Sequence, residues 1–222
     1  MNVTAPRIVL ATHNAGKIRE FRALLTGSEA LAHLDMGAVV LDAGSAGCQE
    51  IPETGVTFEE NSLIKARAVA AATGLPAVAD DSGLAVEVLG GAPGIFSARW
   101  AGAGATDARN LQLLLEQLAD IPEAHRGAAF ICAASLVLPD GRETTRLGRL
   151  EGTLLTVPRG EGGFGYDPVL QPSGDTRSCA ELTMDQKNTI SHRGKAFSAL
   201  RADIVAALTS NGDGDLHEQA AP

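Results

Sequence analysis

Residues 7–25 read RIVLATHNAGKIREFRALL, which is a strand, a polar turn and a helix in succession. Residues 7–11 form a short apolar run that is typical of a buried strand. The helix that follows carries its apolar side chains on one face at helical spacing: Ile18, Phe21, Leu24 and Leu25. A strand that leads through a polar turn into a helix favours the α/β class.

The same alternation continues toward the middle of the chain. Thr57 begins a T-x-x-E pattern with Glu60, which predicts the start of a helix that ends near residues 74–76. Residues 77–79 read as a strand that ends at Asp80 and Asp81. Ser82 and Gly83 then predict a break, and residues 84–89 read as the next strand.

The second half of the sequence predicts further helices and a hairpin. Thr106, Thr183 and Ser191 are candidate caps of three helices. Residues 128–138 and a stretch near 144–151 read as two strands, and Pro139-Asp140-Gly141 reads as the hairpin turn between them. The expected class is therefore α/β, with strands and helices alternating along much of the chain.

Length and charge set the broad class. The 222 residues, 45% of them apolar, suit one large domain or two closely merged lobes over residues 1–208, followed by a disordered tail at 209–222. The net charge of -9 disfavours long nucleic acids as partners. Three cysteines without a CxxC pair indicate reduced thiols. With no signal peptide or membrane span evident, the cytoplasm is the expected compartment.

The first candidate site is the turn THNAGK at residues 12–17. A strand-to-helix turn presents free backbone N–H groups at a helix N-terminus, where an anion is favoured. Gly16 permits close approach and Lys17 supplies a positive charge. The pattern is not a Walker A loop, and an ordinary capped turn is the alternative interpretation.

The second candidate site is the pair Asp80-Asp81, followed by Ser82. Two carboxylates at the end of a buried strand suit Mg²⁺, and one of them can take a proton from a water molecule. Adjacent strand residues point to opposite faces, so either the strand ends here or only one Asp is catalytic. A turn capped by an Asp is the alternative. Glu53 lies upstream as a further acidic residue.

Two more stretches have ligand-binding character. GGFGYDP at residues 162–168 places glycines around Phe164 and Tyr166, which offers a surface for stacking a flat ring, and Asp167 can read donors on a base edge. Lys187 and the Ser191-His192-Arg193 stretch place cations at and before a helix start. For both stretches a purely structural role is the alternative.

Taken together and in order, five motifs resemble the inosine triphosphate pyrophosphatase family, which hydrolyses nonstandard purine triphosphates such as dITP and XTP. They are ATHNAGKIREF, TGVTFEENSLIKA, ADDSGLAVEVLGGAPGIFSARWAG, GGFGYDP and ISHRGKA. The resemblance extends over almost all of residues 7–208. It implies an α/β fold with a long central mixed sheet flanked by helices, and two lobes with an active-site cleft between them. It also implies a homodimer and a requirement for Mg²⁺.

The resemblance also implies roles for individual residues. Asp81 matches the catalytic base and a metal ligand, and the other acidic positions implicated in metal binding are Asp80 and Glu53. The implied substrate-binding residues are Thr12, His13, Asn14, Ala15, Gly16, Lys17, Lys65, Ser82, Phe164, Gly165, Tyr166, Asp167, Lys187, His192 and Arg193.

The expected reaction converts a nucleoside triphosphate (ITP, dITP or XTP) and water to the monophosphate and pyrophosphate. Three alternatives compete with it. A related pyrophosphatase would prefer modified pyrimidine nucleotides, a nucleotide sensor would bind ITP without hydrolysis, and a nucleic-acid-binding protein would need basic stripes that this sequence lacks. No membrane partner is expected.

Overall fold

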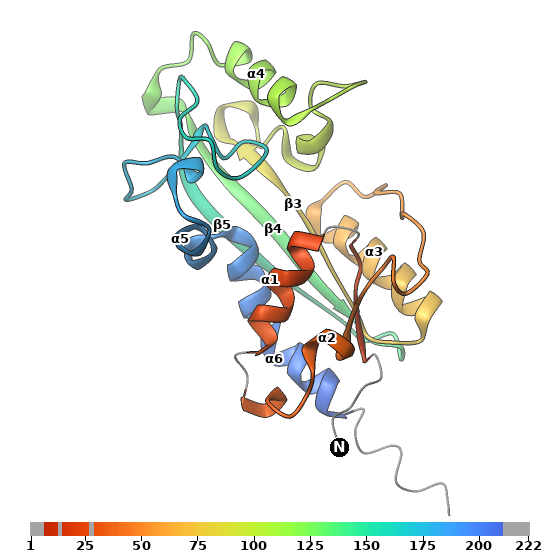
Figure 1. Ribbon diagram of the computed structural model, residues 1–222. Helices are drawn as coiled ribbons and strands as arrows, with labels where there is room; N and C mark the ends of the chain where they lie inside the picture. Colours follow the sequence, from red (N-terminus) through yellow and green to blue (C-terminus); the bar gives the residue numbers. More distant parts are fainter. Residues whose placement is uncertain (1–6, 13–14, 27–28, 211–222) are drawn as a thin grey trace, which may run out of the picture.

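A six-stranded mixed sheet forms the centre of the computed structural model, which describes residues 7–12, 15–26 and 29–210 (Figure 1). The strand order is β2-β1-β3-β4-β5-β6. β1 pairs in parallel with β2 and β3, whereas the pairs β3–β4, β4–β5 and β5–β6 are antiparallel. The strands are β1 (Ile8–Leu10), β2 (Val40–Asp42), β3 (Ala77–Val86), β4 (Gly127–Val137), β5 (Glu143–Leu154) and β6 (Leu170–Pro172).

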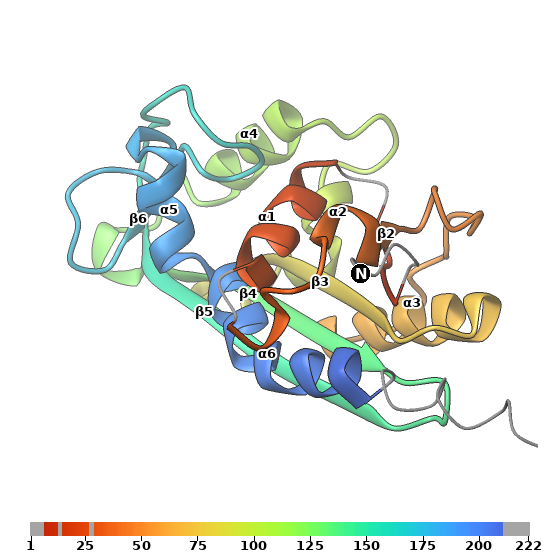
Figure 2. The ribbon, with the colours of Figure 1, turned by 60° about the horizontal axis from the view of Figure 1, so that its bottom comes forward.

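Helices cover both faces of this sheet. The α-helices are α1 (Ala15–Thr26), α2 (Met36–Val39), α3 (Phe58–Thr73), α4 (Asp107–Gln117), α5 (Met184–Ile190) and α6 (His192–Ser210). Short 3-10 helices are η1 (Glu29–Leu31), η2 (Glu87–Leu89), η3 (Gly94–Arg99), η4 (Glu123–His125) and η5 (Cys179–Glu181). α1 and α6 share one apolar cluster with the sheet, and α3 packs on the opposite face (Figure 2).

The predicted helix caps are confirmed. The side chain of Thr57 accepts a hydrogen bond from the N–H of Glu60, and α3 ends at Gly74, whose left-handed backbone favours glycine. Thr106 caps α4, and Thr183 forms a complete capping box with Gln186 at the start of α5. The side chain of Ser191 accepts from the N–H of Gly194 at the start of α6.

The prediction that a strand ends at Asp81 is wrong, because β3 runs without interruption from Ala77 to Val86. It pairs with β4 along its whole length, and this long-range pairing overrides the local turn signal of Ser82-Gly83. Gly83 allows a close approach. A Cβ atom there would lie 2.4 Å from the carbonyl oxygen of Gly94. The segment predicted as the next strand is instead the end of β3 followed by η2.

Apolar clusters lie at both ends of the long strands. α1, α6 and the first half of β3 share one cluster, whereas α4, β6 and the second half of β3 share another. Figure 1 shows α4 at one end of the sheet and α1, α2 and α3 toward the other. Cys48, Cys132 and Cys179 are free thiols, as expected. No helix in the described part of the chain is long and apolar enough to cross a bilayer.

Candidate functional site

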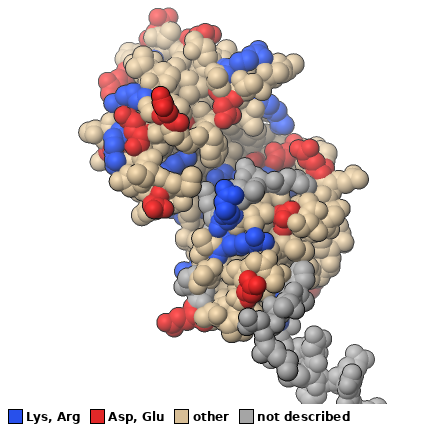
Figure 3. Space-filling view, viewed as in Figure 1, with Lys and Arg blue, Asp and Glu red and all other residues tan. Residues whose placement is uncertain are grey.

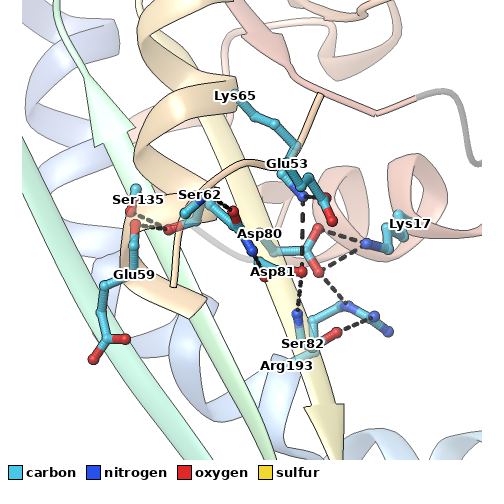
Figure 4. A network of polar contacts seen from close by, with 12 residues as sticks. Lys17, Glu53, Glu59, Ser62, Lys65, Asp80, Asp81, Ser82, Ser135 and Arg193 are labelled. Carbon is cyan, nitrogen blue, oxygen red and sulfur yellow. Dashed lines mark hydrogen bonds and ion pairs between the residues drawn. The ribbon is translucent and has the colours of Figure 1, made fainter. Parts of the chain in front are cut away.

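Asp80 and Asp81 point to opposite faces of the sheet, because consecutive side chains alternate along the uninterrupted strand β3. Asp80 contacts Lys17 of α1 and Arg193 of α6. Asp81 instead contacts Lys65 of α3 (Figure 4). It also accepts a hydrogen bond from Asn61 of the same helix. The sequence left two possibilities, that the strand ends at these residues or that only one Asp is catalytic. The geometry fits the second.

Two cations hold the buried carboxylate of Asp80. The ammonium of Lys17 lies 2.9 Å from both carboxylate oxygens, and Nε of Arg193 donates to Oδ2 over 3.1 Å. Burial by itself would raise the pKa of Asp80, but the charges of Lys17 and Arg193 outweigh it and hold the pKa well below its ordinary value of 3.8. Asp80 therefore stays ionised and fixes the two cations in place.

Asp81 has a different environment. Burial raises the pKa of Asp81 above its ordinary value of 3.8, with the ammonium of Lys65 opposing this shift and Glu53 adding to it. Asn61 donates to Oδ2 of Asp81 over 3.0 Å, and Lys65 lies 3.9 Å from Oδ1. Lys65 also pairs closely with Glu53. A carboxylate with a raised pKa is a stronger base than an ordinary Asp, as a proton-accepting role requires.

A large open cleft lies beside this network, with a volume of about 820 Å³. Its charged lining residues are Lys17, Glu50, Glu53, Lys65, Asp80 and Arg99. Thr12, which follows β1, also lines it. The N–H of Ala11 donates to the carbonyl oxygen of Val78 over 2.7 Å, so the end of β1 lies directly beside β3. Asp81 borders the cleft through Lys65 rather than lining it.

A second, smaller pocket of about 150 Å³ lies further along β3, on the face that carries Ser82. Aromatic and polar side chains alternate around it. Its lining includes Ser82, Ser97, Asp107, Asn110, Phe130, Phe164, Asp167, Lys187, His192 and Arg193. A small cavity with flat apolar walls and a few polar groups suits a planar heterocycle better than a flexible chain. Arg193, which lines the pocket, bonds Ser82 of the pocket and Asp80 of the cleft, and so connects the linings of the two spaces.

The glycine loop at residues 162–168 supplies one wall of the small pocket. Phe164 is 62% exposed and is covered by the ammonium of Lys187, 4.8 Å from the ring centre. Tyr166 is buried, and its hydroxyl donates to the carbonyl oxygen of Ser97. Of the two predicted stacking rings, Phe164 is therefore the accessible one. Asp167 accepts from Lys187 and from the N–H of Phe164.

His192 also lines this pocket. Its ring stacks on Phe130 with ring centres 5.1 Å apart. Burial, followed by the charges of Arg193 and Lys187, lowers the pKa of His192 to about 3, so the ring is neutral near pH 7. Nδ1 is buried, and no partner for it occurs among the residues the structure describes. A neutral imidazole with a free nitrogen can bind the polar edge of a ligand.

The structure brings most of the predicted site residues together around these two spaces. His13 and Asn14 lie outside the described residues, and Ala15 and Gly16 are the first residues of α1. Ser82, one of the implied substrate-binding residues, lines the small pocket and not the open cleft. Four further lining residues were not predicted from the sequence: Ser97, Arg99, Asp107 and Asn110. The motif GGAPGIFSARWAG contains the first two and was the only available signal for them.

Two carboxylates of this network are candidate metal ligands. In the described part of the chain, no three His, Cys, Asp or Glu side chains form a metal-binding group. Glu53 and Asp81 nevertheless share one cation, the ammonium of Lys65. Mg²⁺ commonly uses one or two protein carboxylates together with water and substrate phosphate oxygens, and this pair fits that pattern. Asp80 as a further ligand stays a prediction.

Comparison with known proteins gives consistent matches. Residues 8–203 match the Ham1 family. A dITP/XTP pyrophosphatase of Streptomyces coelicolor is 62% identical over 194 residues, 87% of this chain and 94% of that protein. One from Mycobacterium tuberculosis is 48% identical over 91% of this chain and 97% of its own length.

Solved structures agree with these sequence matches. A HAM1 protein from Coxiella burnetii superposes with a TM-score of 0.81 at 40% identity, covering 90% of this chain and 99% of its own. The nucleoside-triphosphatase / dITP/XTP pyrophosphatase of Mycobacterium abscessus superposes with a TM-score of 0.73 at 45% identity, covering 87% of this chain and 98% of its own.

Proposed function

This chain belongs to the Ham1 family, and we propose that it hydrolyses nonstandard purine nucleoside triphosphates to the monophosphate and pyrophosphate. ITP, dITP and XTP are the proposed substrates, and their removal keeps these nucleotides out of DNA and RNA. The dITP/XTP pyrophosphatase names of its relatives support this activity.

One observation carries the proposal at the level of the site. A cation-lined cleft and a small pocket for a flat ring lie next to each other along β3, and Arg193 joins them. A nucleoside triphosphate has the same two parts, a polyanionic chain and a planar base. We assign the triphosphate to the cleft beside Lys17 and Lys65, and the base to the pocket beside Phe164.

Asp81 is the proposed general base. It takes a proton from a water molecule that attacks the α-phosphorus, and the bond to the β-phosphate oxygen breaks to release pyrophosphate. Its raised pKa strengthens it as a proton acceptor. Lys17 and Lys65 hold and neutralise the phosphates, and positioning with charge neutralisation supplies most of the acceleration.

Glu53 and Asp81 are the proposed protein ligands of a divalent metal, and Mg²⁺ is the proposed ion. Such an ion supplies neutralisation of charge on the phosphate oxygens. With Glu53 and Asp81 holding the ion, Lys65 would remain next to them as a phosphate contact. Asp80 keeps Lys17 and Arg193 oriented toward the substrate.

Selectivity is proposed to come from donors in the base pocket. Inosine and xanthosine carry a 6-keto oxygen where adenosine carries an amine. Lys187 and Arg193 offer donors to that oxygen, and an amine in its place leaves a donor unpaired. The neutral ring of His192 adds a further polar contact. The pocket must also reject the 2-amino group of guanosine.

The proposal extends to the molecular setting. We infer a homodimer in the cytoplasm, with a nucleotide as the substrate and neither nucleic acid nor membrane as a partner. The net charge of -9 supports the absence of a nucleic-acid partner. On the face seen in Figure 3, Lys and Arg side chains are interspersed with acidic ones and form no continuous band.

A single assay tests this function. Pyrophosphate release is measured from ITP, dITP, XTP, GTP, ATP and dUTP, with and without Mg²⁺. The proposal expects fast, metal-dependent turnover of the first three and slow turnover of the others. Preferred turnover of dUTP would reassign the enzyme to pyrimidine nucleotides. Tight binding of ITP without release of pyrophosphate would make the chain a sensor.

A further inference from the structure

Arg99 lines the open cleft together with Lys17 and Lys65, although neither its spacing nor its position in the sequence singled it out. It is the last residue of η3, a segment that contacts β3 and is remote in sequence from both lysines. Its side chain is exposed to solvent. The cleft wall therefore carries three cations from three separate elements.

The two lysines differ from Arg99 in their partners. Lys17 is paired with Asp80, and Lys65 is paired with Glu53. Within the described residues Arg99 has no carboxylate partner, and its recorded contact is with the ring of Phe96, 5.2 Å from the ring centre. Stacking on a ring leaves the in-plane N–H groups of a guanidinium free for an anion.

The backbone on both sides of Arg99 is held in place. The buried side chain of Asn110 donates to the carbonyl oxygen of Ala98 and accepts from the N–H of Ala101. The hydroxyl of Tyr166 donates to the carbonyl oxygen of Ser97. Ser97 and Ala98 line the small pocket, so this short segment connects that pocket to the cleft. An anchored backbone with a free guanidinium is suited to capture an anionic ligand.

We propose that Arg99 binds the pyrophosphate portion of the substrate and retains it as the leaving group. The inference rests on the proposed function. A planar guanidinium can donate two parallel hydrogen bonds to phosphate oxygens, which an ammonium cannot do. Since Arg99 gives up no carboxylate when it binds, its charge is fully available to the pyrophosphate. The residue is thus a third phosphate contact beside Lys17 and Lys65.

The test measures binding of the two products separately. Isothermal titration calorimetry with pyrophosphate plus Mg²⁺, and with IMP, is run on the wild-type chain, Arg99→Ala and Arg99→Lys. We expect pyrophosphate affinity to fall about tenfold or more in Arg99→Ala and less in Arg99→Lys, with IMP affinity unchanged. The KM for ITP should rise by a similar factor, and kcat should change less.

Arg142→Ala is the matched control, because Arg142 is an exposed arginine in the β4–β5 turn and its loss changes the net charge equally. It should leave both affinities unchanged. Equal pyrophosphate affinity in wild type and Arg99→Ala, or a loss confined to IMP, overturns the inference. If the wild-type chain hydrolyses no triphosphate, the proposed function fails, while the pyrophosphate titration still decides the role of Arg99.

Discussion

Asn61 donates a hydrogen bond to Asp81 over 3.0 Å, and its side-chain oxygen accepts one from the N–H of Gly55 over 2.8 Å. Asn61 is fully buried at the start of α3. One amide therefore fixes both the carboxylate of Asp81 and the loop that carries Glu53. The proposed base and the proposed metal ligand from a separate segment depend on this one side chain for their relative position.

Asn61→Ala should lower both stability and turnover. It leaves the buried carboxylate of Asp81 and the partly buried N–H of Gly55 without this partner, which costs about 1–3 kcal/mol. Displacement of Asp81 should reduce kcat for ITP about 10–100-fold. Urea unfolding and steady-state kinetics measure the two effects.

Ser62→Ala is the control for this substitution. Ser62 is the next residue of α3, equally buried, and bonds Ser135 instead of Asp81. It should lose stability while keeping most of its kcat. Equal losses of kcat in both variants would mean that Asn61 acts only through the stability of α3.

Asp81→Asn should remove the proton acceptor and keep the fold, since the side chains have nearly the same shape. Turnover of ITP should fall by about 10²–10⁴-fold. Thermal unfolding should show a native-like transition, and binding of ITP without hydrolysis should persist. A variant with near wild-type kcat would remove Asp81 from the role of base.

Lys187→Ala should weaken discrimination between bases. The substitution removes the cation that pairs with Asp167 and covers Phe164. The ratio of kcat/KM for ITP to that for ATP should fall about tenfold. Lys195→Ala, an exposed lysine that donates to the carbonyl oxygen of Arg149, is the control and should keep the ratio. An unchanged ratio in Lys187→Ala would exclude Lys187 from base selection.

Acid should destabilise the protein partly through His192. Its pKa is lowered from the ordinary 6.5 to about 3 in the folded chain. As the pH falls below 6.5, the unfolded chain takes up a proton at His192 that the folded chain does not. The contribution of His192 to stability is therefore complete above pH 6.5 and is lost progressively between pH 6.5 and about pH 3.

His192→Phe lacks this titration and should be less sensitive to acid. In that pH window, the free energy of unfolding of the wild type should fall more steeply, by up to about 1.4 kcal/mol per pH unit. Urea unfolding of both proteins at several pH values gives the two slopes. Parallel slopes would mean that His192 is protonated in the folded chain.

Local signals predicted the types of the elements well. Thr57, Thr106 and Thr183 predicted helix starts that the structure has, because a capping hydrogen bond spans only three residues. The apolar spacing of the first helix is also confirmed, with Ile18, Phe21 and Leu25 buried. Such features depend on neighbours in sequence and can be read without the fold.

Features that depend on distant segments were not predictable in this way. Gly148 of β5 is one example, since a Cβ atom there would lie 2.0 Å from the carbonyl oxygen of His192. The close approach of α6 to the sheet requires this glycine, yet no turn or motif identifies it. Ser97, Asp107 and Asn110 likewise reach the small pocket only because η3 and α4 pack beside the loop at 162–168.

The sequence by itself determined the α/β class, the helix starts and the ordered set of motifs that carries the chemistry, because each depends on residues close together along the chain. Only the tertiary structure decided which partners the two carboxylates have. Asp80 binds Lys17 and Arg193, whereas Asp81 contacts Asn61 and Lys65. The reason is the pairing of β3 with β4, which keeps the strand extended through a turn-like sequence and sends adjacent carboxylates to opposite faces.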